Sequence, residues 1–363
     1  MRLTLIVSSL NPGGAERVLS NLASYWSHQG HEVTIVTFAP PESVPFYALA
    51  KGVKITQLNL SEPQSSIIRR ISDIFKRCLT LRKTIKSSQP DAVISFITAT
   101  NLMALMACVR LGVPLIVSER THPAYHIIPK LHTKLRHLLY PNAARVVVQT
   151  PSIAACFKYL DNITVIPNGI SIPPLPVAKD KSHSSKSIIS VGRLIKSKGF
   201  HILIYAFSLL AKEDLQTTLT IYGDGEERQN LEKLISDRGL NGRVFLPGTV
   251  KDIVGKLSEA DLFVFPSEYE GFPNALCEAM ASGLPVIASN CSGNIDLIQD
   301  GINGRLFSVG DSDKLAGIMH EILRDHDQRH RLASEARQSI CLLDESNIYR
   351  RWDELIHEVA RFE

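Results

Sequence analysis

The 363-residue chain lacks the cysteine pattern of a metal site or a disulfide framework. Its six cysteines, at positions 78, 108, 156, 277, 291 and 341, are scattered and include no Cys-x-x-Cys pair. Structural zinc sites and small disulfide-bonded domains both depend on closely spaced cysteines. We therefore expect a reducing compartment, with neither zinc nor disulfides.

Long apolar runs are missing too. The longest, residues 102–117, is interrupted by an arginine, a glycine and a proline, so it falls short of a membrane span. Residues 1–10 have only a short apolar core, which predicts a buried first strand and no signal peptide. The apolar content of 44% and charged content of 21% are typical of soluble globular proteins, and the length suits two domains.

A large net charge is absent, but the two halves of the chain differ. Residues 1–180 carry 19 lysines and arginines against 9 acidic residues, while residues 181–363 carry 21 against 27. A basic first half beside an acidic second half predicts different partners for the two halves. We expect no nucleic-acid partner.

Short apolar strands alternate with helical stretches through both halves, which is typical of parallel sheets built from βαβ units. The prediction is an α/β protein of two tandem Rossmann-like, doubly wound domains with an interdomain cleft. Residues 1–172 form the first domain, the proline-rich residues 173–187 a linker, residues 188–343 the second domain, and residues 344–363 a final helix that packs back on the first. Ligands of such sheets bind at the carboxyl ends of the strands.

Two glutamates flank a predicted helix start in the segment Glu270-Gly-Phe-Pro-Asn-Ala-Leu-Cys-Glu278. We expect Asn274 to cap the helix and Gly283 to follow its end. Unpaired N–H groups at a helix start suit a phosphate, and carboxylates suit hydroxyls, so the segment could grip a nucleotide sugar. Two solvated glutamates around an ordinary helix are an equal alternative on this pattern alone.

Other strand ends carry glycines and basic residues. Gly13 and Gly14 follow the first strand without forming a Gly-x-Gly-x-x-Gly or P-loop motif, and a plain tight turn explains them almost as well. Arg193 and Lys198 follow the first strand of the second half, where a diphosphate needs charged donors, although a solvated basic loop is the commoner case. Two more glycine loops, at Gly223 and Gly248, follow later strands.

In this order the motifs resemble those of the retaining glycosyltransferases of family 4, which have the GT-B fold. The matching segments are Gly-Gly-Ala-Glu from residue 13, Ile-Pro-Asn-Gly from 166, Val-Gly-Arg from 191 with Lys198, Tyr-Gly-Asp-Gly from 222, Leu-Pro-Gly from 246, and residues 270–278. The resemblance covers essentially the whole chain, which is similar to bacterial N-acetylhexosaminyltransferases of surface-glycan and lipid-linked oligosaccharide assembly. It implies a hexosyl or N-acetylhexosaminyl donor, most simply a UDP-sugar, and a polyprenyl-diphosphate-linked or other membrane glycan as acceptor.

The resemblance also implies residue roles. Arg193 and Lys198 would neutralise the donor diphosphate, Glu278 would bind ribose, and Glu270 would contact the transferred sugar. Gly13 and Gly14 would cover the diphosphate, and the loop through Gly248 and Val250 would hold the base. The remaining donor contacts would come from Gly223 and from Gly271, Phe272, Pro273, Asn274, Ala275 and Leu276.

One departure from the family concerns the reacting centre. Many members carry a histidine after the fourth strand of the first domain, where this chain has Arg120, with His122 two residues on. Either residue could orient the transferred sugar, and His122 could equally be a loop histidine.

The resemblance implies retention of anomeric configuration without a cofactor or metal. With no evident covalent nucleophile, the expectation is a front-face displacement in which the leaving phosphate departs toward Arg193 and Lys198. Asp311-Ser-Asp313 matches a metal-binding Asp-x-Asp only superficially, and we expect it to cap a helix.

Residues 67–86 have the spacing of an amphipathic helix with a basic face that includes Arg69, Arg70, Lys76 and Arg77. Such a face suits an anionic membrane surface, although a core-packing helix with a solvated face is commoner. We expect a peripheral protein at the inner face of a bacterial plasma membrane. A UDP-sugar epimerase of the same fold and a non-catalytic nucleotide-sugar-binding protein are the alternatives. The sequence leaves open the donor (UDP-GalNAc, UDP-GlcNAc, UDP-Gal or GDP-Man), the acceptor, the linkage and the oligomeric state.

Overall fold

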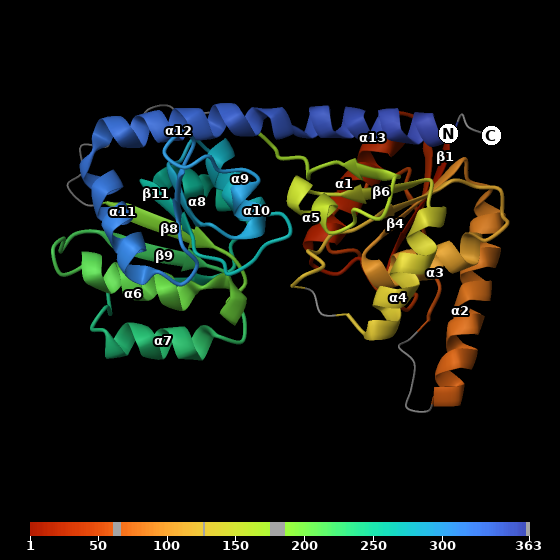
Figure 1. Cartoon of the computed structure of the whole chain (residues 1–363), viewed down its shortest axis with the longest axis horizontal. Helices are drawn as coiled ribbons and strands as arrows, with labels where there is room; N and C mark the ends of the chain where they lie inside the picture. The colour runs from red at the N-terminus through yellow and green to blue at the C-terminus, as the bar shows by residue number, and fades with distance from the viewer. Residues whose placement is uncertain (61–66, 126–127, 175–185, 361–363) are drawn as a thin grey trace. The chain divides into compact units, whose positions relative to one another are not determined.

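A computed structural model describes residues 1–60, 67–125, 128–174 and 186–360, with the side chains of the second helix from Asp73 onward (Figure 1). Most of the expected linker, residues 173–187, lies outside the described residues. The chain divides into two compact units. Unit 1 comprises Met1–Gly169 together with the chain from Ser346 onward, and unit 2 comprises Ile170–Glu345. Each unit is described by itself.

Unit 1 contains a seven-stranded sheet in the order β3-β2-β1-β4-β5-β6-β7. All neighbouring pairs are parallel. Its strands are β1 (Arg2–Val7), β2 (Glu32–Thr37), β3 (Lys54–Gln57), β4 (Ala92–Phe96), β5 (Leu115–Ser118), β6 (Arg145–Val148) and β7 (Ile163–Val165). The central strands are buried along nearly their whole length, as expected of a sheet covered by helices on both faces.

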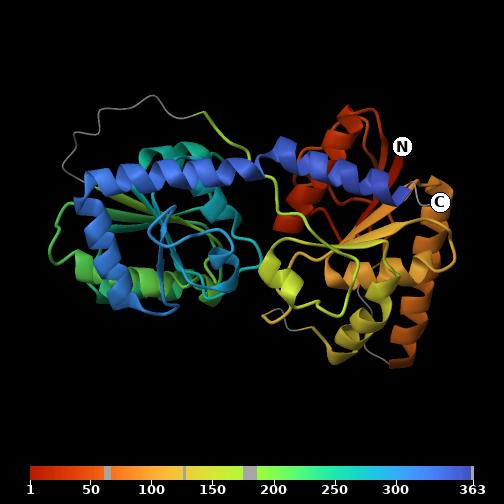
Figure 2. The same cartoon turned by 45° about the horizontal axis from the view of Figure 1, so that its top comes forward.

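The helices of unit 1 lie on both faces of this sheet. One layer consists of α2 (Ile67–Ser88), α3 (Thr98–Cys108) and α4 (Lys130–Leu139), with α3 in contact with both of the others (Figures 1 and 2). The helix α1 (Gly14–His28) packs against β1 and β2 and against the C-terminal helix α13 (Glu345–Ala360). Short elements complete the unit, namely η1 (Tyr140–Asn142) and α5 (Pro151–Ala155).

The helix α13 is bound to α1 by buried polar and aromatic contacts. Asp353 accepts hydrogen bonds from the Tyr25 hydroxyl and the Trp26 Nε1, each at 2.7 Å. Trp352 is buried and packs edge-on against Trp26. These contacts assign the end of the chain to unit 1.

Unit 2 contains a six-stranded parallel sheet in the order β10-β9-β8-β11-β12-β13, so its strands are wound in the same sequence as the first six of unit 1. The strands are β8 (Ser187–Val191), β9 (Thr218–Tyr222), β10 (Val244–Gly248), β11 (Leu262–Phe265), β12 (Val286–Ser289) and β13 (Arg305–Phe307). The helices are η2 (Lys196–Lys198), α6 (Phe200–Leu210), α7 (Arg228–Asp237), α8 (Ile253–Glu259), α9 (Asn274–Ala281), α10 (Ser292–Ile295), α11 (Ser312–Arg324), α12 (His326–Ile340) and η3 (Cys341–Leu343).

Two apolar cores lie on opposite faces of the sheet of unit 2. One holds residues of α6, α7 and α11, such as Phe207 and Met319, and the other holds residues of α8, α9 and α12, such as Leu276 and Ala336. This arrangement, with the same strand order in both units, confirms the predicted pair of doubly wound α/β domains.

No helix among the described residues is both long and apolar enough to cross a membrane.

Candidate active site

The loops after β8 and β11 meet in unit 2. These two strands are neighbours in the sheet, and the chain winds away from them in opposite directions, which makes their carboxyl ends the switch point where such sheets bind ligands. The loop after β8 contains Arg193 and Lys198, and the loop after β11 contains Glu270. The structure therefore brings together residues that the sequence placed far apart.

Lys198 and Glu270 form an ion pair across this switch point. The Lys198 Nζ lies 2.5 Å from the Glu270 Oε1, and the two side chains are 21% and 10% exposed. The same ammonium lies 5.4 Å from the centre of the Phe265 ring, near enough for a cation–π contact. Because burying a carboxylate without a partner is costly, the Lys198 ammonium stabilises Glu270 and holds its side chain in place.

Glycines let the loops of this site approach one another. A Cβ on Gly199, whose φ is +67°, would lie 2.1 Å from the carbonyl oxygen of Pro266. A Cβ on Gly223, whose φ is +140°, would lie 1.8 Å from the carbonyl oxygen of Gly192. A Cβ on Gly293 would lie 2.8 Å from the Cβ of Glu270. The glycines thus allow backbone to pack against the Arg193 and Glu270 loops.

Arg193 is exposed and, among the described residues, has no side-chain partner. Its backbone is fixed all the same, because the neighbouring Leu194 N–H donates to the Asp224 carbonyl at 2.9 Å. A guanidinium on a fixed loop beside the Lys198–Glu270 pair is available for an anion.

The helix α9 begins at Asn274, and the residue at its N-cap is Pro273, which makes no side-chain cap bond. The prediction that Asn274 caps this helix is therefore wrong. The Asn274 N–H donates to the Phe272 carbonyl at 3.1 Å, a tight turn that puts Asn274 into the helix. In the part of the chain that the structure describes, the amides of Ala275 and Leu276 have no acceptor, so they stay available to a ligand.

The far end of α9 agrees with expectation. Gly283 follows the helix with a φ of +74°, the left-handed conformation of a C′ glycine. Glu278 lies one turn inside the helix and is partly exposed. Its assignment to ribose, like the other residue roles, stays a prediction.

The loop expected to hold the base follows β10. Gly248 has a φ of +88°, and its carbonyl accepts from the Gly223 N–H at 2.9 Å, which joins this loop to the one after β9. The Arg228 side chain donates to the Leu246 carbonyl at 2.6 Å and so holds the start of this loop. Val250 is 36% exposed beside it.

In unit 1, Gly13 is the N-cap of α1 and Gly14 its first residue. The Tyr47 hydroxyl donates to the Gly13 carbonyl at 3.1 Å and accepts from the Gly13 N–H at 3.3 Å. A Cβ on Gly13 would lie 2.1 Å from Glu16 Oε2, so the glycine lets a carboxylate pack against the turn. That negative charge disfavours a phosphate at this spot.

Arg120 follows β5 and is enclosed by aromatic rings. Its Cζ lies 4.8 Å from the Phe96 ring centre and 6.0 Å from that of Trp352, and its Nη1 donates to Asn168 Oδ1 at 2.7 Å. Its Nε and Nη2 are buried and have no hydrogen-bond partner among the described residues. Burial lowers the pKa of this guanidinium to about 9. Those two nitrogens are closed off from solvent, so in this arrangement they are not exposed to a ligand.

His122 is 8% exposed and held in the following turn. Its Nδ1 accepts from the Ala124 N–H at 3.2 Å, and its ring lies 4.9 Å from that of Tyr125. These contacts favour the loop-histidine alternative. A role at the reacting centre stays a prediction for both Arg120 and His122.

A buried carboxylate beside Arg120 was missed by the sequence analysis. Glu119 is fully buried, accepts from the Thr98 hydroxyl at 2.9 Å and accepts a very short hydrogen bond from the Tyr140 hydroxyl. Burial raises the pKa of Glu119, and the Tyr140 and Thr98 donors offset part of that rise. The only signal in the sequence is an acidic residue directly after an apolar strand.

The Asp311-Ser-Asp313 segment is a helix start, as predicted, since the Asp311 side chain accepts from the Lys314 N–H and caps α11. Nowhere in residues 1–60, 67–125, 128–174 and 186–360 do three histidine, cysteine or acidic side chains gather as a metal site would require.

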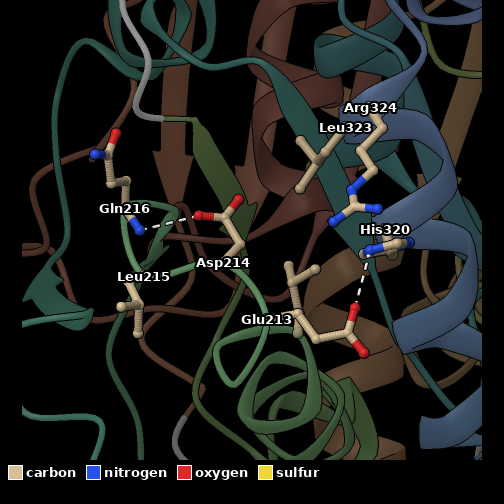
Figure 3. Close-up of a pocket in the computed structure, with 8 residues that line it drawn as sticks. Glu213, Asp214, Leu215, Gln216, His320, Leu323 and Arg324 are labelled. Carbon is tan, nitrogen blue, oxygen red and sulfur yellow. Dashed lines mark hydrogen bonds and ion pairs between the residues drawn. The ribbon is translucent and has the colours of Figure 1, made fainter.

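A hollow of about 350 Å³ lies at the other end of the sheet of unit 2, where the chain enters β9 (Figure 3). Glu213 pairs with His320 at 3.0 Å, and Asp214 accepts from the Gln216 N–H at 2.9 Å. Parallel sheets bind ligands at the carboxyl ends of their strands, so this amino-end hollow is separate from the site around Lys198 and Glu270.

Comparison with known families matches both halves of the chain. Residues 12–172 match the family described as Glycosyltransferase Family 4, and residues 173–339 match the family described as Glycosyl transferases group 1.

Curated relatives extend the match to the whole chain. A Campylobacter jejuni enzyme named GalNAc-alpha-(1->4)-GalNAc-alpha-(1->3)-diNAcBac-PP-undecaprenol alpha-1,4-N-acetyl-D-galactosaminyltransferase is 31% identical over 99% of both chains. The Escherichia coli UDP-Gal:alpha-D-GlcNAc-diphosphoundecaprenol alpha-1,3-galactosyltransferase is 28% identical over 72% of this chain and 74% of its own.

Solved structures show the same fold. Sucrose-phosphate synthase from Thermosynechococcus elongatus superposes with a TM-score of 0.87 at 18% identity, over 99% of each chain. Anabaena HepE in complex with UDP superposes with a TM-score of 0.82 at 21% identity, over 99% of this chain and 100% of that one.

Proposed function

We propose that this chain, which belongs to the family 4 glycosyltransferases, moves a hexosyl or N-acetylhexosaminyl unit from a UDP-sugar to an undecaprenyl-diphosphate-linked glycan. The observation that carries the donor half is the group formed by Arg193, Lys198 and Glu270 at the switch point of unit 2. It combines exposed positive charge for a diphosphate with a fixed carboxylate for sugar hydroxyls.

The geometry supports the following donor contacts as part of this proposal. Arg193 and Lys198 take the diphosphate, and the free amides at the start of α9 add N–H donors. Glu278 takes the ribose and the Gly248–Val250 loop the base. Glu270, held by Lys198, takes hydroxyls of the transferred sugar. The site therefore binds the donor along its whole length.

The reaction proceeds with retention and without a metal. The bond from the anomeric carbon to the phosphate oxygen breaks as the acceptor hydroxyl attacks from the same face. The leaving phosphate oxygen receives the hydroxyl proton, while Arg193 and Lys198 stabilise its charge. Full activity in excess chelator, with an unchanged anomeric configuration in the product, is the expected result.

Arg193→Ala tests this assignment. Loss of one donor to the leaving group is expected to lower kcat by about 10²–10³ at saturating donor. The matched control is Lys196→Ala, an exposed lysine of the same loop, which should leave kcat within about twofold. Equal kcat values for a folded Arg193→Ala protein and the wild type would refute the role.

The acceptor proposal rests on two curated relatives. The printed names of the Campylobacter jejuni and Escherichia coli enzymes specify undecaprenol-linked diphosphate acceptors. The name of the Campylobacter jejuni enzyme supports N-acetylgalactosamine as the transferred sugar, and the UDP-Gal in the name of the Escherichia coli enzyme supports UDP as its carrier. Radiolabelled sugar that enters the organic phase only with a polyprenyl-diphosphate glycan present would support this choice.

Exposed side chains on the α2–α4 layer fit a peripheral place on the inner face of the plasma membrane. Phe75 of α2 is 65% exposed, and Leu131 and Leu138 of α4 are 63% and 68% exposed. Exposed lysines of the same two helices stand beside them, at positions 76, 83, 86, 130 and 134. Apolar side chains among lysines suit an anionic bilayer surface. The side chains of Arg69 and Arg70 lie outside the described residues.

The membrane proposal predicts salt-sensitive binding to vesicles that contain an anionic lipid. Phe75→Ser with Leu138→Ser should weaken flotation with such vesicles about tenfold or more. Charge reversal at Arg69, Arg70, Lys76 and Arg77 should abolish it. Leu215→Ser in unit 2 is the matched control, because Leu215 is 77% exposed and lies on the other unit. Unaltered flotation of the Phe75 and Leu138 variant would contradict the proposal.

A further inference from the structure

The loop after β2 holds two apolar side chains in solvent beside the Gly13 turn. Val44 is 83% exposed and Phe46 is 63% exposed. The loop begins at the carboxyl end of β2, and Gly13 follows the carboxyl end of the adjacent, parallel β1. Both segments therefore lie at the ligand-binding edge of the sheet of unit 1.

The loop is fixed in place although its tip is exposed. The Phe46 N–H donates to the Leu10 carbonyl at 3.0 Å, and the Gln57 side chain donates to the Ser43 carbonyl at 2.6 Å. The Tyr47 hydroxyl makes both of its hydrogen bonds to Gly13, and its ring packs edge-on against Phe46 with centres 5.0 Å apart. A ring that folding has already ordered loses little entropy when a ligand covers it.

A carboxylate also packs against the same turn. Glu16 packs against the Cα of Gly13, and a side chain at that position would collide with it. In the described part of the chain, Glu16 has neither a hydrogen-bond donor nor a cation as partner. The Gly13 turn thus contacts a carboxylate directly and is linked through Tyr47 to an exposed aromatic ring.

We propose that Phe46, Glu16 and the Tyr47–Gly13 turn form a subsite for a pyranose ring of the acceptor, most simply its N-acetylhexosamine. A pyranose has an apolar face of C–H groups and a polar edge of hydroxyls. Phe46 stacks on that face, and Glu16 accepts hydrogen bonds from that edge. The inference rests on the proposed function and assigns the sugar half of the acceptor.

The charge of this subsite differs from that of the α2–α4 layer, which is proposed to face the membrane. Residues 38–50 carry one charged side chain, Glu42, and no lysine or arginine. Residues 38–50 therefore offer no positive charge to an anionic bilayer or a diphosphate, and a neutral sugar needs none. The observations therefore favour the glycan over the membrane as the occupant of Phe46.

The test uses the full-length protein with UDP and a lipid-free methyl glycoside of an N-acetylhexosamine disaccharide. Binding is followed by ligand-observed saturation-transfer NMR, and transfer is measured separately with a nucleotide-sugar donor. Phe46→Ala and Glu16→Gln should each weaken glycan binding and raise the acceptor KM about tenfold, with the donor KM within about twofold. Phe46→Trp should retain binding, and Leu215→Ala is the control for loss of an exposed apolar side chain.

Three outcomes would overturn the inference. They are a wild-type protein that does not bind the glycan, a Phe46→Ala protein that binds it equally well, and a Phe46→Ala defect that appears only with vesicles. The last would make Phe46 a lipid contact. Glycan binding that needs Phe46, in a protein that transfers no sugar from any nucleotide donor, would instead refute the proposed function and leave the subsite standing.

Discussion

At the scale of single residues, the motifs predicted the chemical groups but not their partners. Lys198 and Glu270 came from separate short patterns, and their ion pair depends on two loops that meet only after the sheet has formed. Asn274 was misassigned as a cap because the preceding turn makes Pro273 the last non-helical residue. The capping preference of a single residue type does not encode such a turn.

Glu119 shows the same limit more strongly. Its hydrogen-bond donors are the hydroxyls of Thr98 and Tyr140, which a sequence pattern around residue 119 cannot reveal. The carboxylate is tolerated at full burial because both of its oxygens accept hydrogen bonds.

Tyr140→Phe is expected to destabilise the protein in a pH-dependent way. Burial holds the pKa of Glu119 above its unfolded value, so this group's contribution to stability is largest below about pH 4.5 and is lost as pH rises through the folded pKa. Removing the Tyr140 donor raises that pKa further and deepens the loss. The free energy of unfolding should fall by about 1–3 kcal/mol at pH 8 and by less at pH 5.

Urea titrations at both pH values check this expectation. Tyr205→Phe is the control, since among the described residues the Tyr205 hydroxyl has no hydrogen-bond partner and its ring keeps the Arg238 contact. If Tyr140→Phe lowered the free energy of unfolding equally at pH 5 and pH 8, the Tyr140 hydroxyl would not be stabilising the ionised form of Glu119.

At the scale of elements, periodicity predicted the buried helices and strands well. The helices predicted at residues 67–86 and 344–363 correspond to α2 (Ile67–Ser88) and α13 (Glu345–Ala360), which agree with the predicted ranges to within three residues. The strand β3 was missed because it is a four-residue edge strand with exposed polar ends. The helix α4 was missed because Leu131 and Leu138 lie on its exposed face and give no core-facing period.

The attachment of α13 gives a prediction at this scale. Asp353 accepts from two partly buried donors on α1, and burial together with Asp353 raises the pKa of Tyr25 to about 12. Asp353→Ala should lower the free energy of unfolding by about 2–4 kcal/mol, because both donors lose their acceptor. It should also bring the Tyr25 pKa down toward 10.

Denaturant unfolding and absorbance titration of tyrosine measure the two effects. Glu354→Ala removes an acidic side chain from the solvent face of the same helix and should change neither. If Asp353→Ala behaved like Glu354→Ala, the helix would be held by its apolar contacts alone.

At the scale of the whole molecule, the alternation of strands and helices predicted two wound sheets, and both units have them. The sequence could not show the spatial meeting of β8 and β11, since strand order depends on crossovers that no local pattern encodes. It predicted Gly223 as a donor contact, but it did not predict that the glycines at positions 199, 223 and 293 let the loops of the site pack against one another. Those glycines matter only through contacts with other loops.

Removal of residues 346–363 tests the division into units. These residues belong to unit 1, so the truncated chain should expose the α1 face that Trp352 covers and lose transfer. Unit 2 should keep the donor site, and UDP should still raise the unfolding temperature of the remaining calorimetric transition. Truncation after residue 360 is the control. Loss of the UDP effect in the shorter chain would show that the donor unit depends on α13.

The chain leaves unit 1 at Gly169 and returns to it at Ser346, which makes unit 2 an insertion within unit 1. During synthesis on the ribosome, unit 2 is therefore complete while unit 1 still awaits its last helix. The usual order, in which the N-terminal domain folds first, is reversed. Until α13 has emerged from the ribosome, we expect the nascent unit 1 to expose the surface that Trp352 later covers, and this is the surface that a chaperone would protect.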